Sequence, residues 1–267
     1  MCFAFVRPAA RFSGPDKKWS ARTGVGYQVR AMSGSETASN RRRLQPGERV
    51  GDHLIVRSVL GQGGTAVVYE ALHTRLGAAV ALKVLDVPES YWHDGVLRMQ
   101  REAQVCASID DPHVPRIYDI NALPDGTPYV VMEKVAGKTL EELLAEGPLA
   151  LQTVLAIADD LLAALAAVHR VGVIHRDIKP ANLILQRESD SAYRVRLMDF
   201  GVSKATFREP TDPKLTRVGT VVGTPHYMAP EQITGDAVDA RADVYATGVV
   251  LFEMLSGRMP FEGESTA

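Results

Sequence analysis

Hydrophobic positions change their spacing along the chain, and the change divides it into a strand-rich part followed by a helix-rich part. In the first part, short β-branched segments are separated by glycine-containing turns such as Gly61–Gly64 and Gly77, a pattern typical of antiparallel strands. The expected strands are His53–Leu60, Thr65–Leu72, Ala78–Leu85, Arg116–Leu123 and Pro128–Val135.

One helix is expected between the third and fourth of these strands. Val96, Met99 and Ala103 recur at the three- and four-residue spacing of a single helix face. Asp94 is a candidate N-cap, and Asp110-Asp111-Pro112 would end the helix, because the residue before a proline disfavours helical backbone. The first part is therefore predicted to be β-rich with one helix.

After Gly137 the pattern becomes mainly helical, and residues 199–233 are expected to form a loop. Polar residues interrupt the longest apolar run, near Leu161–Val168, well before the ~20 residues that span a bilayer, so no membrane segment is expected. The expected helices are Thr139–Glu146, Leu149–Val171 and Ala240–Leu255, and the expected short strands are Asn182–Gln186 and Arg194–Met198.

Residues 1–45 show neither the two-residue period of a strand nor the roughly 3.6-residue period of a helix. They mix Gly, Ser, Pro and Arg, which predicts disorder. Residues 1–49 hold ten of the 30 lysines and arginines but three of the 32 acidic residues. The tail is therefore basic and the remainder acidic. An acidic body argues against a nucleic-acid-binding fold. A solvated tail is the simpler interpretation of the basic segment, and contact with an acidic surface is the alternative.

Overall composition is that of a globular protein, with 46% hydrophobic and 23% charged residues among 267. Only two cysteines, Cys2 and Cys106, are present. They exclude a disulfide framework and a cysteine-based zinc site, and they favour a reducing, cytoplasmic location.

A glycine-rich segment, Gly61-Gln-Gly-Gly-Thr-Ala-Val-Val68, joins the first two expected strands. Glycine lets backbone N–H groups approach a polyphosphate closely, although a plain hairpin turn would have the same composition. A P-loop is excluded because no Gly-Lys-Ser/Thr follows, and a dinucleotide-binding fingerprint is excluded because a strand follows rather than a helix.

Lys83 ends an otherwise apolar strand, Val80-Ala-Leu-Lys83. A buried ammonium needs an anionic partner, and Glu102 in the expected helix is a candidate. The alternative is a lysine whose long side chain reaches the surface.

Carboxylate and amide side chains also gather in loops at the ends of predicted elements. His175-Arg-Asp177-Ile-Lys-Pro-Ala-Asn182 follows the long helix, and Asp199-Phe-Gly201 follows the last short strand. One such residue alone is explained as a turn or a helix cap. Together they supply what Mg²⁺ and a hydroxyl substrate require, since Mg²⁺ is held by one or two carboxylates plus phosphate oxygens.

These motifs, in this order and with Pro225–Glu231 after them, resemble the catalytic domain of protein kinases, and in particular the eukaryotic-like Ser/Thr kinases of bacteria. The resemblance implies a two-lobed α+β fold, with a β-rich N-lobe containing one helix and a mainly helical C-lobe. It implies a kinase domain over residues 46–267 after the tail of residues 1–45. Within that domain the N-lobe would be residues 46–133, the hinge 133–138 and a partial C-lobe 138–267.

The resemblance also implies roles for single residues, with ATP and Mg²⁺ as cofactors. Asp177 would accept the proton of a Ser/Thr hydroxyl on a protein substrate, Lys179 would neutralise the transferring phosphoryl group, and Lys83 would hold phosphates while paired with Glu102. Asn182 and Asp199 would hold the metal. The nucleotide would be bound by Leu60, Gly61, Gln62, Gly63, Gly64, Thr65, Ala66, Val68, Ala81, Lys83, Met132, Glu133, Val135 and Ile184.

Ser/Thr specificity is implied by Lys179, two residues after Asp177, and by Thr224 in a Gly-Thr-Pro substrate loop. Arg176 implies activation by phosphorylation of the loop after Asp199. Thr216 is the expected site and Thr220 the second choice, although threonines there can also be simple loop residues.

Three features depart from the family pattern. Ala66 replaces the third glycine of the loop, and Lys134 stands where an aromatic residue is common. The family continues beyond the helix that bears Asp243, whereas this sequence stops at Ala267, so an incomplete C-lobe is expected. A weakly active, nucleotide-binding regulatory pseudokinase or gene fragment is therefore the alternative function. Oligomeric state and protein substrate are left open.

Overall fold

The computed structural model describes residues 43–63, 66–85, 104–188, 193–199 and 225–261. All of them belong to one compact unit, Arg41–Ala267. Several predicted features lie outside the described residues: most of the helix around Val96, of which Gln104–Cys106 is seen, and Gly64, Thr65, Glu102, Thr216, Thr220 and Thr224.

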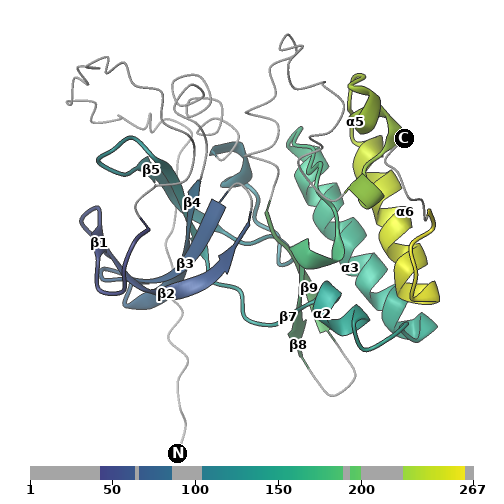
Figure 1. Ribbon diagram of the computed structural model, residues 1–267, viewed down its shortest axis with the longest axis horizontal. Coiled ribbons are helices and arrows are strands. Elements are labelled where there is room, and N and C mark those ends of the chain that lie inside the picture. The colour runs from purple at the N-terminus through teal and green to yellow at the C-terminus, as the bar shows by residue number, and fades with distance from the viewer. Residues whose placement is uncertain (1–42, 64–65, 86–103, 189–192, 200–224, 262–267) are drawn as a thin grey trace, which may run out of the picture. The chain divides into compact units, whose positions relative to one another are not determined.

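The first part of the chain forms a six-stranded antiparallel sheet, which confirms the predicted strands (Figure 1). The strand order is β1-β2-β3-β4-β6-β5, so β6 and not β5 pairs with β4. The strands are β1 (Arg49–Val50), β2 (Leu54–Gln62), β3 (Ala66–His73), β4 (Ala78–Leu85), β5 (Ile117–Ala122) and β6 (Pro128–Glu133).

The register of this sheet sorts its side chains onto two faces, because cross-strand partners share a face and successive residues alternate. Tyr69, Leu82 and Val131 belong to the buried apolar cluster of one face. On the other face, Lys83 stands opposite Val68 of β3 and Val130 of β6 and is only 9% exposed. The sheet thus places one lysine among apolar neighbours.

The chain just before β1 is also fixed to the sheet. Leu44 is buried in the same cluster as Tyr69, and its N–H donates to the Tyr69 hydroxyl at 3.3 Å.

The second part is built on a long helix, α3 (Leu151–Arg170), and a three-stranded sheet, of which the helix and two strands were predicted and the third strand was not. The sheet has the order β7-β8-β9, with β7 (Lys138–Thr139), β8 (Leu183–Arg187) and β9 (Tyr193–Leu197). The shorter helices are α2 (Leu140–Leu144), α5 (Pro230–Thr234) and α6 (Arg241–Ser256), and the 3₁₀ turns are Pro180–Asn182 and Pro225–Tyr227.

The prediction of loop through residue 233 was wrong at its end, because α5 begins at Pro230. Proline at the first helical position and Gly235 in the left-handed region at the C-cap are both helix signals. They bound only five residues, too few for a hydrophobic period to show.

Among the described residues, α3 is the one helix long and apolar enough to cross a membrane by length and composition. One face of α3 is core, however: Ile157, Leu161 and Val168 are at most 1% exposed and belong to the cluster that also contains Leu197 of β9 and Val250 of α6. This packing accounts for the apolar residues of that face, whereas Leu151, Leu155 and Leu162 on the rest of the helix are exposed.

Gly137 connects the first sheet to the second in a conformation that only glycine adopts easily. Its φ is +152°, and a Cβ placed there would lie 2.5 Å from the Leu185 carbonyl oxygen and 2.7 Å from Ile184 Cγ2. The chain can therefore pass close to β8 only without a side chain at this position.

We expect Gly137→Ala to lower the free energy of unfolding by about 2–4 kcal/mol, since it combines backbone strain with a clash against β8. Gly77→Ala is the matched control, because Gly77 has a positive φ of +65° but a Cβ at this residue would meet nothing within 4 Å. It should cost about 1 kcal/mol. Urea unfolding of both variants measures the difference, and equal losses would contradict the close approach.

Candidate functional site

The loop of residues 175–182 is held in place by one buried carboxylate on α6. Asp243 is 1% exposed, and its Oδ1 and Oδ2 accept the N–H groups of Arg176 (2.7 Å) and His175 (2.8 Å). Nε2 of His169, at the end of α3, lies 2.7 Å from the same Oδ2. The carboxylate therefore satisfies backbone donors that would otherwise be buried without partners, which is costly.

His175 links this loop to the residue before Asp199. Its Nδ1 accepts the Asp177 N–H at 3.2 Å, so its Nε2 is the protonated nitrogen and donates to the Met198 carbonyl at 2.8 Å. Complete burial lowers the pKa of His175 below its usual 6.5, despite the nearby carboxylate of Asp243, which raises it. The ring is thus a neutral spacer between the two segments.

Two non-glycine residues of the site have left-handed backbone: Arg176 (φ 63°) and Asp199 (φ 56°). Such conformations cost about 1–3 kcal/mol each and persist where surrounding contacts enforce them. At Arg176 those contacts are Asp243 on its N–H and the Gln232 side-chain amide, which donates to its carbonyl at 3.2 Å. Among the described residues, Arg176 Nε is a buried nitrogen without a hydrogen-bond partner.

Asp177 is contacted by the polar side chains of Asn182 and Lys179. Nδ2 of Asn182 donates to the Asp177 carbonyl (2.7 Å) and to its Oδ2 (3.1 Å). The Lys179 ammonium lies 3.3 Å from the same Oδ2. The structure therefore brings together the predicted residues Asp177, Lys179 and Asn182.

Lys83 joins this group from the first sheet. Its Nζ is 2.6 Å from Oδ1 of Asp199, which follows β9 directly. The lysine therefore has an anionic partner and does not reach the surface. The predicted partner, Glu102, lies outside the described residues, so that pairing stays a prediction.

The side chains of Asn182 and Asp199 suit a small, hard cation. Asn182 uses its amide N–H groups on Asp177, which leaves its carbonyl oxygen available, and the Asp199 carboxylate is 39% exposed. Their main chains are close as well, since Met198 N–H donates to the Asn182 carbonyl at 2.8 Å. Within the described ranges, no group of three or more His, Cys, Asp and Glu side chains is placed to hold a metal. A carboxylate and an amide oxygen completed by phosphate oxygens match the preference of Mg²⁺.

The predicted nucleotide-binding residues lie on both sheets. Ala81 is the cross-strand partner of Met132, and Val68 is that of Lys83, so all four share one face of the first sheet. Ile184 of β8 is half-buried between the fully buried Leu183 and Leu185, so it points away from the core of the second part. Leu60 and Gly61–Gly63 are exposed at the end of β2.

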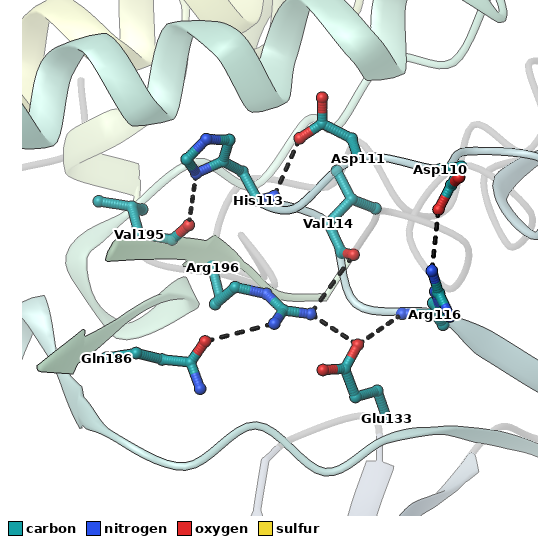
Figure 2. Close-up of polar contacts among 9 residues, drawn as sticks. All are labelled: Asp110, Asp111, His113, Val114, Arg116, Glu133, Gln186, Val195 and Arg196. Atoms are coloured by element: carbon teal, nitrogen blue, oxygen red, sulfur yellow. Dashed lines mark hydrogen bonds and ion pairs between the residues drawn. The ribbon is translucent and has the colours of Figure 1, made fainter. Parts of the chain in front are cut away.

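The segment Glu133–Gly137 joins the two sheets, and two ion pairs hold its first residues. Arg196 of β9 lies 2.6 Å from Glu133 Oε2, and Lys134 lies 2.6 Å from Glu70 of β3 (Figure 2 shows the first pair). Burial raises the pKa of Glu133, but hydrogen bonds from Arg196 and from the Arg116 N–H outweigh this and hold its pKa below the usual value. The carboxylate is therefore charged at neutral pH.

Neither Arg196 nor Glu70 was singled out from the sequence. Arg196 sits in a strand where charged and apolar residues alternate, which is typical of any half-exposed strand, and Glu70 is a single acidic residue in an otherwise mostly apolar strand. Their partners lie 63 and 64 positions away in the chain, so the local pattern carried no signal of either contact.

Comparisons with known proteins agree with this geometry. Residues 54–267 match the family described as "Protein kinase domain". Serine/threonine-protein kinase pkn3 of Myxococcus xanthus is 38% identical over 211 residues, which are 79% of this chain and 39% of that protein. Serine/threonine-protein kinase PknD of Mycobacterium tuberculosis is 43% identical over 224 residues, 83% of this chain and 32% of that protein. This chain thus spans between about a third and two fifths of the length of these relatives.

A solved structure gives the same result for the fold. The crystal structure of the Mycobacterium tuberculosis PknI kinase domain superposes with a TM-score of 0.65 at 28% sequence identity, covering 85% of this chain and 82% of that chain. Together with the lysine, aspartates and asparagine that the fold brings together, these matches show that the chain belongs to the protein kinase family and has its two-lobed α+β fold.

Proposed function

We propose that this chain transfers the γ-phosphoryl group of ATP to Ser or Thr hydroxyls of protein substrates, with Mg²⁺ bound, and that it works in the cytoplasm. The observation that carries the proposal is the Asp177 carboxylate. It is held by Asn182 and Lys179 in a loop braced from α6, and His175 of that loop bonds to the carbonyl of Met198, the residue before Asp199, which pairs with Lys83. The family and its Ser/Thr-kinase relatives support the same reaction.

Asp177 is the candidate base. Its carboxylate takes the proton of the attacking hydroxyl as the new oxygen–phosphorus bond forms and the bond from the γ-phosphorus to the β–γ bridging oxygen breaks, which leaves ADP. The Asn182 amide fixes the orientation of this carboxylate. Lys179, only 3.3 Å away, supplies a positive charge beside the transferring group.

Lys83 is the candidate anchor for the phosphates, and it is neutralised by Asp199 in this structure. Asp199 and Asn182 would hold Mg²⁺, which supplies positive charge against the phosphate oxygens when bound. An Asp199 carboxylate engaged in that way would leave more of the Lys83 charge for the nucleotide. Glu102 would then be the partner that keeps Lys83 in place.

Adenine would be held by the main chain of Glu133 and Val135, between Val68 and Ala81 on one side and Ile184 on the other. In the first sheet, Ala81 and Met132 are neighbours across β4 and β6. Leu60, Gly61, Gln62, Gly63, Gly64, Thr65 and Ala66 would cover the phosphates.

Phosphorylation of the loop after Asp199 would regulate the reaction. Arg176 directly precedes Asp177, has strained backbone and carries a buried Nε with no partner among the described residues. A phosphothreonine supplies three acceptor oxygens and about −1.5 to −2 charges, which suit a guanidinium. We propose Thr216 as the site, with Thr220 as the second choice.

Asp177→Asn should lower phosphoryl transfer to the chain itself or to a basic protein substrate by about a hundredfold or more, because a positioned base contributes about 10²–10⁴-fold. ADP affinity should change little, since Asp177 acts on the hydroxyl and not on the nucleotide. Transfer is measured with radiolabelled ATP and Mg²⁺. The control is Asp239→Asn, because Asp239 is an exposed aspartate just before α6. Equal labelling by wild type and Asp177→Asn would contradict the mechanism. ADP binding without any transfer by wild type would favour the weakly active regulatory alternative.

Thr216→Ala should lower activity toward an added substrate, because Arg176 would lose its phosphate partner. Arg176→Ala should make activity independent of the residue at position 216, since the group that reads the phosphate is then absent. Mass spectrometry of active protein identifies the modified residue. Finding both Thr216 and Thr220 unmodified would exclude this switch while leaving the transfer reaction in place.

A further inference from the structure

Arg196 is the centre of a polar network that joins three separate segments of the chain (Figure 2). Its Nη2 donates to Glu133 Oε2 at 2.6 Å and to the Val114 carbonyl at 3.5 Å, and its Nη1 donates to Gln186 Oε1 at 3.3 Å. The side chain is only 10% exposed. A buried cation with several directed bonds fixes the relative position of the groups that it binds.

Glu133, the main partner, is fixed in both its side chain and its main chain. Its N–H donates to the Arg116 carbonyl at 2.8 Å, and its Oε2 accepts the Arg116 N–H at 3.2 Å. At the next residue, Lys134 is held by Glu70 on β3. The start of the hinge is thus held by β9 at Glu133 and by β3 at Lys134. These two contacts restrict any shift of the hinge main chain.

Arg196 also lies beside Ile184, a residue assigned to the nucleotide. It is the cross-strand partner of Ile184, so both side chains are on the same face of the β8–β9 pair. Asp199 follows on the same chain segment, three residues after Arg196. The network therefore connects two groups proposed to contact adenine. The main chain of the hinge would contact the edge of the ring, and Ile184 would contact one of its faces.

A purely stabilising role is the simpler explanation, but the chemistry favours a positional one. Buried ion pairs seldom stabilise a fold more than apolar residues of similar volume, and their best-established use is to fix register. Glu133 is 29% exposed, so it can be hydrated if the arginine is replaced. Arg196→Met should therefore remain folded while the hinge loses one of its two ion pairs.

We propose that Arg196 is a positioning residue that sets the hinge main chain for adenine through Glu133, and that it thereby determines both the affinity for adenosine nucleotides and the preference for adenine over other purines. The proposal rests on the proposed function, because it assigns adenine to the main chain of Glu133 and Val135. Adenine presents an amino donor to a carbonyl there, whereas hypoxanthine presents a carbonyl, so a displaced hinge discriminates less between them.

The test compares Arg196→Met with Arg194→Met in the full chain. Arg194 lies on the same strand and pairs with Glu188, but both side chains are nearly half exposed and neither contacts the hinge. Binding of adenosine and inosine, which carry no phosphate, is measured by calorimetry at a temperature where circular dichroism shows each variant folded.

In Arg196→Met we expect the Kd for adenosine and the KM for ATP to rise about five- to tenfold, the size of one lost or lengthened hydrogen bond. The preference for adenosine over inosine should shrink by a similar factor, while the KM for a protein substrate stays within about twofold of wild type. Arg194→Met should leave both nucleoside affinities unchanged. Adding Glu133→Gln to Arg196→Met should have little further effect, since the two residues act as a unit.

Arg196→Lys, which keeps the charge but cannot bond three partners in a fixed plane, should give an intermediate loss. It also replaces the methionine variant if that variant does not fold. Unchanged adenosine affinity and unchanged preference over inosine in a folded Arg196 variant would overturn the proposal, even if wild type transfers phosphate. Conversely, a wild type that binds adenosine but transfers no phosphate would count against the proposed function alone. A wild type that binds no adenosine and transfers no phosphate would overturn both.

Discussion

The carboxylate of Asp243 is the contact on which the rest of the site depends. The loop that carries Asp177 turns through a left-handed residue, Arg176, and so presents N–H groups that no regular element can satisfy. A charged acceptor on α6, 67 positions away from Arg176, satisfies two of them. The loop can therefore adopt this conformation only when α6 has formed and packed against α3. The geometry of the site thus depends on the packing of the core and not on the local sequence alone.

The strand β9 connects the two sheets mechanically. Its residue Arg196 holds the beginning of the hinge, its Leu197 N–H donates to the His113 carbonyl at 2.8 Å, and the chain then reaches Asp199, which binds Lys83. A displacement of this one strand would move the hinge together with Asp199 and Lys83, the residues proposed to bind metal and phosphate. Short, rigid elements of this kind are how a small site keeps groups from distant segments in register.

Sequence patterns predicted the parts of this structure that depend on local chemistry. The strands from Leu54 to Leu85 followed from β-branched runs and glycine turns, and Lys83, Asp177, Asn182 and Asp199 were recognisable as polar residues at element ends. The two-residue strands β1 and β7 were missed because they are too short to show a period, and the order β4-β6-β5 depends on pairing that no single segment encodes. Arg196 was missed for a related reason, since its role depends on a contact with Glu133, 63 positions away in the chain.

The buried His175 couples the shape of this loop to the proton concentration. Opening the loop exposes an imidazole whose pKa then returns upward to about 6.5, whereas the closed loop holds it lower. Between those two values the open form binds a proton that the closed form does not, so the stability contributed by the neutral ring is complete above pH 6.5 and is lost as the pH falls below it. Mild acid therefore favours the open form of the loop, because that form binds one hydrogen ion more.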